Sequence, residues 1–252
     1  MSRFLNSIAG WSSILDDLSI CNSSSDEAVL IEHLVSSTGP HVLSFANANA
    51  LNLAWKDQTF SRLLIESDFI LRDGIGIKIL MWLTNREPGL NLNGTDFIPK
   101  LLDGLPRDRK IAIYGTHEPY LGRMLHRLQL MGFSSVLLEN GFHNDEYYLT
   151  QYMRQLPAFV ILAMGMPKQE RVSALLKKAS GERSVLFVNG GAIIDFMANR
   201  YPRAPKWVRN AGLEWVFRFL NEPKRLWKRN ISNFTFILRS ILTRIIQIRH
   251  KN

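Results

Sequence analysis

The sequence has one cysteine, Cys21, among its 252 residues. It can therefore form neither a disulfide within the chain nor a zinc site built from cysteines, and it suits a reducing cytosol. Long apolar runs are also missing, because no stretch reaches the roughly 18 uncharged apolar residues of a membrane-spanning helix. The first residues, MSRFLNSIAGWSS, lack the apolar core of a signal peptide. We expect a globular protein on the cytoplasmic side.

Several motifs for nucleotides, metals and nucleophiles are absent. No GxGxxG follows a strand-like run, and no GxxxxGK[ST] or GxSxG occurs. The six histidines are scattered without the spacing of metal ligands, and two aspartates never occur as Asp-x-Asp, the pattern that holds a nucleotide diphosphate through a metal. These absences argue against a dinucleotide site, a P-loop, a serine hydrolase and a metal-held nucleotide.

Positive charge is concentrated at the end of the chain. The net charge is +9, and residues 223–252 hold eight Lys or Arg and no acidic residue, so the first 222 residues are close to neutral. An apolar fraction of 46% fits a folded protein. The basic tail predicts an anionic partner, which could be a membrane, a nucleic acid or a substrate.

Short apolar runs recur along the first three-quarters of the chain. They read HVLSFA, SDFILRD, KIAIYG, SVLLEN, AFVILAMG and SVLFVNGG. Most are continuous rather than alternating, which is typical of strands buried on both faces of a parallel sheet. Helical patterns lie between them, at 118–132 and 167–180 for example. The order predicts an α/β, Rossmann-like, mostly parallel sheet flanked by helices.

The strand pattern stops after about residue 196. We therefore predict a catalytic core over 1–195 and a basic, helical C-terminal appendage over 196–252. Within the appendage, a helical projection of 231–248 gathers apolar residues on one face. These are Ile231, Phe234, Ile237, Leu238, Ile241, Leu242, Ile245, Ile246 and Ile248, with Phe236 outside the stripe. The stripe fits a membrane-surface helix, or alternatively a packing face between two copies of the chain.

Polar residues and glycines follow the predicted strands. In open α/β sheets, ligands bind beyond the carboxyl ends of the strands, so these positions form the candidate site. They are Asn47, Asn49, Asp73, Gly74, Gly115, Gly165, Gly190 and Gly191. Asp73 could act as a general base or cap a helix, and Gly74 allows close approach of a ligand. Turn residues of this kind are also common without any ligand.

The stretch GMPKQE begins a predicted helix. Pro167 suits a first helical turn, and the backbone N–H groups there could bind an anion together with Lys168. Gln169 can donate to and accept from a sugar or a base. The alternative is an ordinary helix start with a solvated face. In the next turn, Asp195 could cap the helix or bind a ribose or an arginine.

In this order, DGIG, GTDF, GMPKQE, GGAIIDF and RAPKW…GLEWVFRFLNEPKR resemble the WecG/TagA/CpsF family of bacterial glycosyltransferases. The resemblance covers about residues 41–230, and GGAIIDF with the long basic tail is most similar to the exopolysaccharide members of the xanthan-type GumM branch. It implies transfer of a sugar from a UDP-sugar to a polyprenyl-diphosphate-linked saccharide, with inversion and without a metal or a resident cofactor. It also implies a peripheral enzyme on the cytoplasmic face of the plasma membrane.

The resemblance assigns roles to particular residues. Asp73 becomes the base, Asn47 orients sugar or acceptor, Thr95 and Asp96 lie near the substrate pocket, and Gln169 contacts the nucleotide sugar. The threonine usual in the family two residues before the asparagine is Phe45 here, so that polar contact is not carried over. Without a metal, cations must balance the charge of departing UDP, and the candidates are Arg203, Arg218, Arg225 and Lys228.

Two other classes of function remain open on sequence grounds. A nucleic-acid binder would use the basic, tryptophan-bearing tail, although the apolar stripe suits lipid better than phosphate. A non-catalytic membrane-associated partner could retain the fold. We expect no nucleic-acid partner, and we expect residues 223–252 to bind an anionic membrane surface. Neither the donor sugar nor the oligomeric state can be inferred from the sequence.

Overall fold

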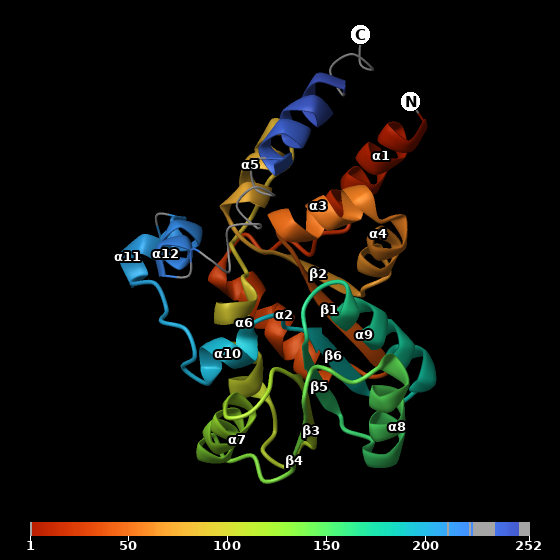
Figure 1. Cartoon of the computed structure of the whole chain (residues 1–252), viewed down its shortest axis with the longest axis vertical. Helices are drawn as coiled ribbons and strands as arrows, with labels where there is room; N and C mark the ends of the chain where they lie inside the picture. Colours follow the sequence, from red (N-terminus) through yellow and green to blue (C-terminus); the bar gives the residue numbers. More distant parts are fainter. Residues whose placement is uncertain (1, 211, 222, 224–234, 247–252) are drawn as a thin grey trace.

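The computed structural model describes residues 2–210, 212–221, 223 and 235–246. Its centre is one six-stranded sheet in which every pair of neighbouring strands is parallel, in the order β2-β1-β6-β5-β3-β4 (Figure 1). The strands are β1 (Pro40–Ala46), β2 (Phe69–Arg72), β3 (Ile111–Gly115), β4 (Val136–Glu139), β5 (Phe159–Ala163) and β6 (Val185–Asn189). The six apolar runs all form strands, and the predicted parallel α/β fold is confirmed.

Helices fill the connections. They are α1 (Ser2–Asp16), α2 (Ser24–Ser36), α3 (Ala48–Lys56), α4 (Gln58–Ile65), α5 (Ile75–Leu83), α6 (Gly94–Gly104), α7 (Tyr120–Leu130), α8 (Asp145–Gln155), α9 (Lys168–Ala179), α10 (Ile193–Met197), α11 (Lys206–Asn210) and α12 (Glu214–Asn221). Residues 235–246 form one more helix, here called the C-terminal helix.

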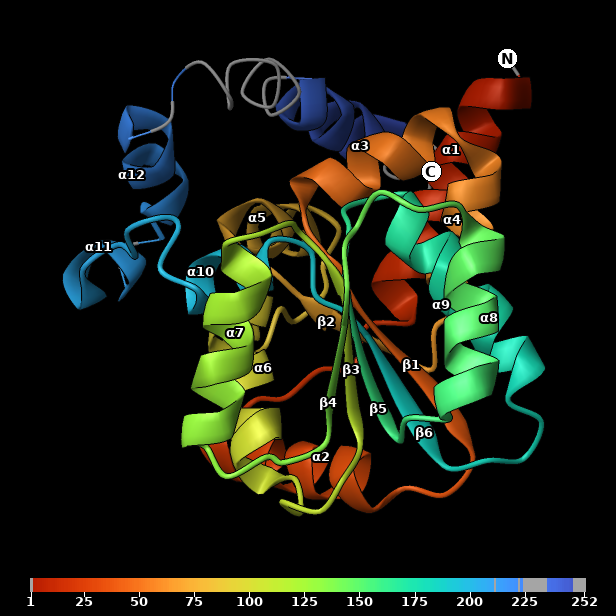
Figure 2. The ribbon, with the colours of Figure 1, turned by 60° about the horizontal axis from the view of Figure 1, so that its bottom comes forward.

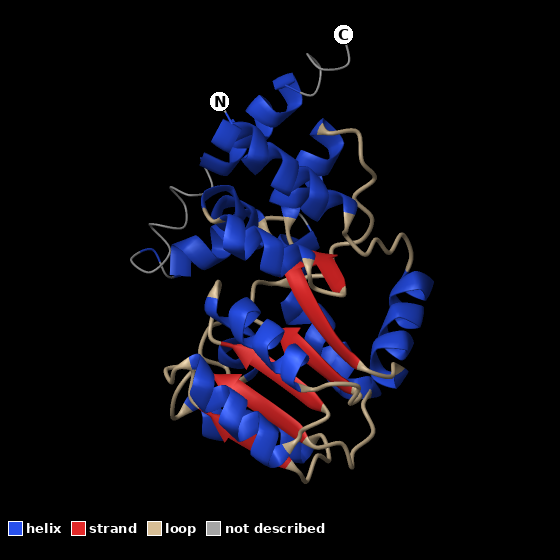
Figure 3. Cartoon of the chain, turned by 90° about the vertical axis from the view of Figure 1, so that its right-hand side faces the viewer, coloured by secondary structure: helices blue, strands red, loops and turns tan. Residues whose placement is uncertain are grey.

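The helices make two layers around the sheet. One layer holds α8 and α9, with α4 packed against α9, and the other holds α2, α6, α7 and α10 (Figure 2). Figure 3 shows the strands in red among the helices in blue. Both faces of the sheet are apolar because both are covered, which explains the continuous apolar runs. β3 and β5 are neighbours, but the helices that follow them lie on opposite faces. In this topology a ligand crevice opens between such strands at their carboxyl ends.

A third group of helices lies beyond the carboxyl edge of the sheet, near β1 and β2. It contains α1, α3, α4 and α5 and has its own apolar core around Trp11, which is fully buried. The C-terminal helix joins this core through Phe236, whose ring centroid lies 5.3 Å from that of Trp11. The first and last parts of the described chain therefore pack together (Figure 1).

The C-terminal helix packs along one edge and leaves its apolar stripe exposed. Phe236, Ser240 and Thr243 are buried, and Arg239 donates to Asn52 Oδ1 at 2.6 Å. The stripe residues Ile237, Leu238, Ile241, Leu242 and Ile245 are 43–55% exposed. Phe236, placed outside the stripe by the helical projection, is the residue that holds the helix to the body. Ile231, Phe234 and Ile248 lie outside the described residues.

The chain leaves the sheet layers after α10. The predicted boundary at residue 195 falls within this short helix, and the division into 1–195 and 196–252 stays a prediction. The segments α11 and α12 project to one side of the sheet (Figure 2). In the part of the chain that the structure describes, no helix is long and apolar enough to cross a membrane.

Candidate active site

Asp73 and Asn47 lie side by side at the carboxyl ends of β2 and β1. The Asp73 backbone N–H donates to the Ala46 carbonyl at 2.9 Å, which extends the pairing of the two strands by one residue. Asn47 Nδ2 then donates to Asp73 Oδ2 at 3.1 Å. Gly74, with φ +94°, is the N-cap of α5 and receives no side-chain cap. Asp73 is therefore not a capping residue, and one of its carboxylate oxygens has no hydrogen-bond donor among the described residues.

Asn47 has a second task. Its Oδ1 accepts from the N–H groups of Asn49 and Ala50, which caps α3. The cap fixes the amide so that its NH2 group faces Asp73. One side chain thus joins the start of α3 to the carboxylate.

Arg72 fixes the loop that carries Asp73. Its buried guanidinium donates to the carbonyls of Pro88, Gly74 and Gly89 at 2.8, 3.1 and 3.0 Å. Burial lowers the pKa of Arg72, and the negative charge of Asp73 opposes that shift. Asn91 accepts from the Gly74 N–H at 2.7 Å. Sequence reasoning missed Arg72, although a charged residue inside an apolar strand run signals a buried residue that needs partners.

The start of α6 brings the predicted GTDF element to this edge. A Cβ on Gly94 would lie 3.4 Å from the ring of Phe45. Asn93 caps α6 and donates to Asp96 at 2.8 Å. Thr95 lies between them in the first turn, half-buried.

Asp96 connects the core to the appendage through two ion pairs. Arg203 donates to Asp96 Oδ1, and Arg209 Nη1 donates to the same atom at 2.9 Å. Partial burial would raise the pKa of Asp96, but the Asn93 hydrogen bond and the charges of Arg203 and Arg209 hold it below its ordinary value. Arg209 was not among the predicted site residues, and nothing distinguished it from its basic neighbours in sequence.

Gln169 lies beneath the β6–α10 turn rather than at the open edge. Its side chain is fully buried, Oε1 accepts from the Gly191 N–H at 3.0 Å, and Nε2 donates to Glu170 at 2.8 Å. A Cβ on Gly190 would lie 2.6 Å from Ile193, and Gly191 has φ +57°. The carbonyl oxygen and the NH2 group of the Gln169 amide are therefore both hydrogen-bonded within the protein, and the residue shapes this turn. Its direct contact with a nucleotide sugar stays a prediction.

A second polar group lies beyond the carboxyl end of β3. Thr116 Oγ1 donates to Asp195 Oδ1 at 2.8 Å, and Arg200 Nη1 donates to the same oxygen at 3.1 Å. Asp195 thus binds an arginine, one of the three roles considered for it. Gly165, with φ +81°, follows β5, the neighbour of β3. Thr116 was not anticipated, since a threonine after a strand carries no motif of its own.

Lys168 is drawn toward the loop after β4. Its Nζ donates to the carbonyls of Gly141, at 2.9 Å, and of His143. Burial lowers its pKa, Asp145 opposes this shift, and Arg171 adds to it. Two of its three donor hydrogens are therefore used within the protein.

The appendage reaches the surroundings of Asp73 as well as those of Asp96. A Cβ on Gly212 would lie 3.4 Å from Ile75, and one on Gly76 would lie 3.2 Å from Phe236 of the C-terminal helix. Arg218 lies in α12, but its side chain is not described. Arg225 and Lys228 lie outside the described residues. The placement of these three predicted cations therefore stays a prediction.

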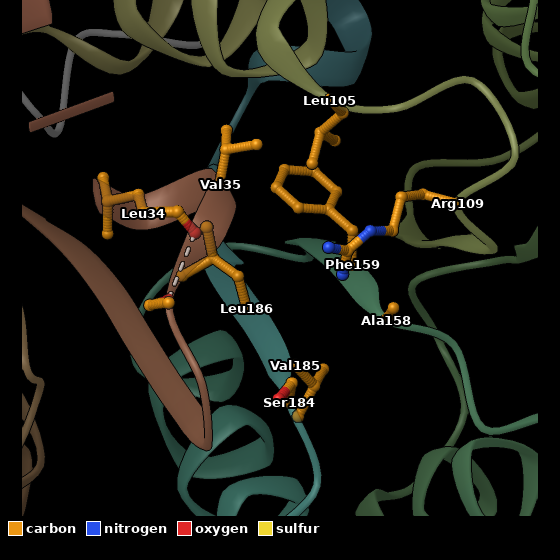
Figure 4. A pocket seen from close by; sticks show the side chains of 10 residues that line it. Leu34, Val35, Leu105, Arg109, Ala158, Phe159, Ser184, Val185 and Leu186 are labelled. Carbon is orange, nitrogen blue, oxygen red and sulfur yellow. Dashed lines mark hydrogen bonds between the residues drawn. The ribbon is translucent and has the colours of Figure 1, made fainter. Parts of the chain in front are cut away.

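In the described part of the chain, neither a cluster of metal ligands nor the pocket between β5 and β6 offers a second catalytic centre. Among the residues that the structure describes, no three His, Cys, Asp or Glu side chains come together to hold a metal ion. A pocket at the amino ends of β5 and β6 lies between Leu34, Leu105, Phe159 and Leu186 (Figure 4). Its volume of about 10 Å³ is far too small for a sugar nucleotide.

Comparison with known proteins confirms the family resemblance. The model of the glycosyl transferase WecG/TagA/CpsF family matches residues 13–250. An N-acetylglucosaminyldiphosphoundecaprenol N-acetyl-beta-D-mannosaminyltransferase of Bacillus subtilis (strain 168) is 28% identical over 81% of this chain and 80% of its own length. A protein of the same name from Bacillus spizizenii is 26% identical over 71% of this chain and 70% of its own. The chain belongs to the WecG/TagA/CpsF family of glycosyl transferases.

Proposed function

We propose that the protein transfers a sugar from a UDP-sugar to a polyprenyl-diphosphate-linked saccharide, with inversion and without a metal ion. The observation that carries the proposal is the Asp73 carboxylate at the carboxyl edge of the sheet, held by Asn47 and with an oxygen available. The names of the two relatives support the lipid-linked acceptor, since both act on N-acetylglucosaminyl-diphospho-undecaprenol. A role in exopolysaccharide synthesis rests on the resemblance of the motifs.

The chemistry follows from one carboxylate. Asp73 takes the proton from an acceptor hydroxyl as its oxygen attacks the anomeric carbon, the bond from that carbon to the UDP oxygen breaks, and UDP leaves from the opposite face. The negative charge that develops on UDP requires cations. Arg203 and Arg209 are near the edge, and their remaining guanidinium hydrogens are the donors for a diphosphate, with Arg218, Arg225 and Lys228 as further candidates.

The acceptor lipid places the enzyme at a membrane surface. The exposed stripe of the C-terminal helix and the basic residues of 223–252 provide apolar burial together with attraction to anionic lipid. We therefore propose peripheral attachment to the cytoplasmic face of the plasma membrane. A non-catalytic partner with the same fold would share this surface, so only a measurement of sugar transfer distinguishes the two functions.

The deciding experiment is a panel of UDP-sugars with a polyprenyl-diphosphate saccharide acceptor, scored for product with and without EDTA. We expect one donor to give product equally well in EDTA. Asp73→Asn should lower turnover by about 10²–10⁴-fold and still bind UDP. The control Asp103→Asn, on the exposed side of α6, should leave turnover unchanged. Retained transfer in Asp73→Asn would reject the base, loss in EDTA would reject metal independence, and no product with any donor would favour the non-catalytic partner.

A further inference from the structure

Glu170 is a buried acid next to the residue that shapes the β6–α10 turn. It lies in the first turn of α9 and is 2% exposed. Its Oε1 accepts from Gln169 Nε2 at 2.8 Å, and its Oε2 has no hydrogen-bond partner among the described residues.

Glu170 belongs to a polar chain that runs beneath the carboxyl edge. Gln169 Oε1 accepts from the Gly191 N–H, and its Nε2 also points toward the Asn189 carbonyl at 3.4 Å. Asn189 Nδ2 donates to Ser44 and Ser173, at 2.9 and 3.1 Å, and Ser173 donates to the Glu170 carbonyl at 3.0 Å. Asn189 Oδ1 is a second buried oxygen without a donor in the described part of the chain. This polar chain thus contains two unpaired acceptor oxygens, and a proton on Glu170 would turn its Oε2 into a hydroxyl group.

Glu170 has no cation to balance a negative charge. It lines a groove of about 520 Å³ between α4 and α9, whose charged residues are Glu66, Lys177 and Lys178. Lys177 is paired with Asp68, which also lies 3.8 Å from His41 at the start of β1, and Arg171 is paired with Asp145 of α8. None of these groups makes an ion pair with Glu170 in the described structure. The groove gives the carboxyl group a route for exchanging its proton with solvent.

We propose that Glu170 is a positioning residue for the carboxyl edge: as a neutral acid it orients the Gln169 amide, and that amide holds the Gly190–Gly191 turn in place. Burial without a cation favours the neutral acid, and it raises the pKa of Glu170 from 4.5 to about 7. The Gln169 hydrogen bond opposes this shift, because it is stronger with the carboxylate. Ionisation near neutral pH therefore places an unpaired charge in the polar chain, draws the Gln169 NH2 group closer to Glu170, and so weakens the hydrogen bond between Gln169 Oε1 and the Gly191 N–H. The link from this turn to catalysis rests on the proposed function.

The first test does not depend on catalysis. In the ¹⁵N-labelled full chain, the amide signal of Gly191 should shift with a midpoint near pH 7, matching the value for Glu170. The shift should vanish in Glu170→Gln, which keeps the shape and an acceptor oxygen but does not ionise. Glu66→Gln removes a carboxylate from the same groove and should leave the shift unchanged. A Gly191 signal that does not titrate, or that titrates equally in Glu170→Gln, overturns the inference.

The second test uses the rate of sugar transfer. Wild-type kcat/KM should fall in one step as pH rises through 7, and Glu170→Gln should keep the value found at lower pH within about threefold and lack that step. Glu170→Ala, which removes the acceptor for Gln169, should lose about tenfold or more at every pH. An unchanged step in Glu170→Gln contradicts the inference. Absence of transfer in the wild type counts against the proposed function alone, because the Gly191 signal still decides the role of Glu170.

Discussion

Asn47 caps α3 through its Oδ1 and donates to Asp73, the proposed base, through its Nδ2. Substitutions can separate these two roles. Asn47→Ser keeps an oxygen that can cap α3 but removes the donor to Asp73. Asn47→Asp also keeps the cap and places a second carboxylate 3.1 Å from the first, at the distance of the present contact. Like charges at this distance disfavour ionisation of both groups.

We expect Asn47→Ser to lower kcat by about tenfold with a nearly unchanged unfolding midpoint. Asn47→Asp should lower it further near neutral pH, and the acidic limb of its pH–rate profile should move to higher pH. The measurements are the pH dependence of kcat and urea unfolding of both variants. Superimposable pH profiles for wild type and Asn47→Asp would show that Asn47 does not act on the catalytic carboxylate.

The ionisation of Glu170 should also change the free energy of unfolding with pH. Its pKa is raised from 4.5 to about 7 in the folded protein, so the folded state binds the proton more tightly than the unfolded chain. The folded state is therefore favoured by this group at low pH and loses that advantage as pH rises from about 4.5 through 7. At 1.36 kcal/mol per unit of pKa, the loss above pH 8 is roughly 3 kcal/mol.

Glu170→Gln removes this ionisation. Its free energy of unfolding should be close to that of the wild type at pH 4 and greater by roughly 3 kcal/mol at pH 8, as measured by urea titration at both values. Glu66→Gln, at the exposed end of the same groove, should show no such difference between the two pH values. A Glu170→Gln protein that is less stable than the wild type at pH 8 would mean that the carboxylate is the favoured form.

At the scale of elements, the first turn of α6 holds the appendage through Asp96 and its two arginines. Asp96→Asn removes the charge that Arg203 and Arg209 share and should loosen residues 199–213. We expect faster tryptic cleavage after Arg203 and Lys206, and about a tenfold loss of transfer rate. Asp103→Asn removes the same charge from the exposed side of α6 and is the matched control. Equal cleavage of both variants would mean that the ion pairs do not hold the appendage.

The strands could be predicted because burial on both faces of a parallel sheet leaves a continuous apolar run in sequence. The positions of Asn47 and Asp73 at strand ends followed from the same pattern. The contact between them could not be predicted, because it requires β1 and β2 to be neighbours in register. No single apolar run determines the order of the strands. The burial of Gln169 was missed for a related reason, because it depends on where the Gly191 N–H falls across two strands.

The roles of side chains within helices were harder to predict from the sequence than the strands were. Helical periodicity predicted the apolar stripe within 231–248, yet the residue outside the stripe, Phe236, makes the tertiary contact with Trp11. Periodicity reports which residues share a face, whereas burial depends on what that face meets. The buried Arg72 and the ion pairs of Arg209 likewise depend on carbonyls and carboxylates that come close only in the folded chain.

At the scale of the whole molecule, the exposed stripe and the basic C-terminal segment predict a binding partner. The stripe is unpaired within the described chain, and each Lys or Arg near an anionic bilayer adds roughly 1 kcal/mol of attraction. We expect the protein to co-sediment with vesicles containing anionic lipid and to be released by salt, with weak binding to zwitterionic vesicles. The other occupant of the stripe would be a second copy of the chain.

One variant separates these two partners. Replacing Ile237, Ile241 and Ile245 together with serine removes three of the five exposed stripe residues and leaves every charge and the Phe236 contact in place. Vesicle binding should fall by at least tenfold, since burial of these side chains is lost. The same number of exposed apolar residues changed elsewhere, as in Val29→Ser with Leu130→Ser and Met153→Ser, should leave it unchanged. Two results together would assign the stripe to contact between copies of the chain. Vesicle binding would be absent or insensitive to salt, and light scattering would show a dimer that dissociates in the stripe variant.

Because the stripe and the appendage contacts to Ile75 and Asp96 belong to one segment, loss of vesicle binding should also affect catalysis. Transfer to a lipid-linked acceptor should fall more than transfer to a short-chain soluble acceptor.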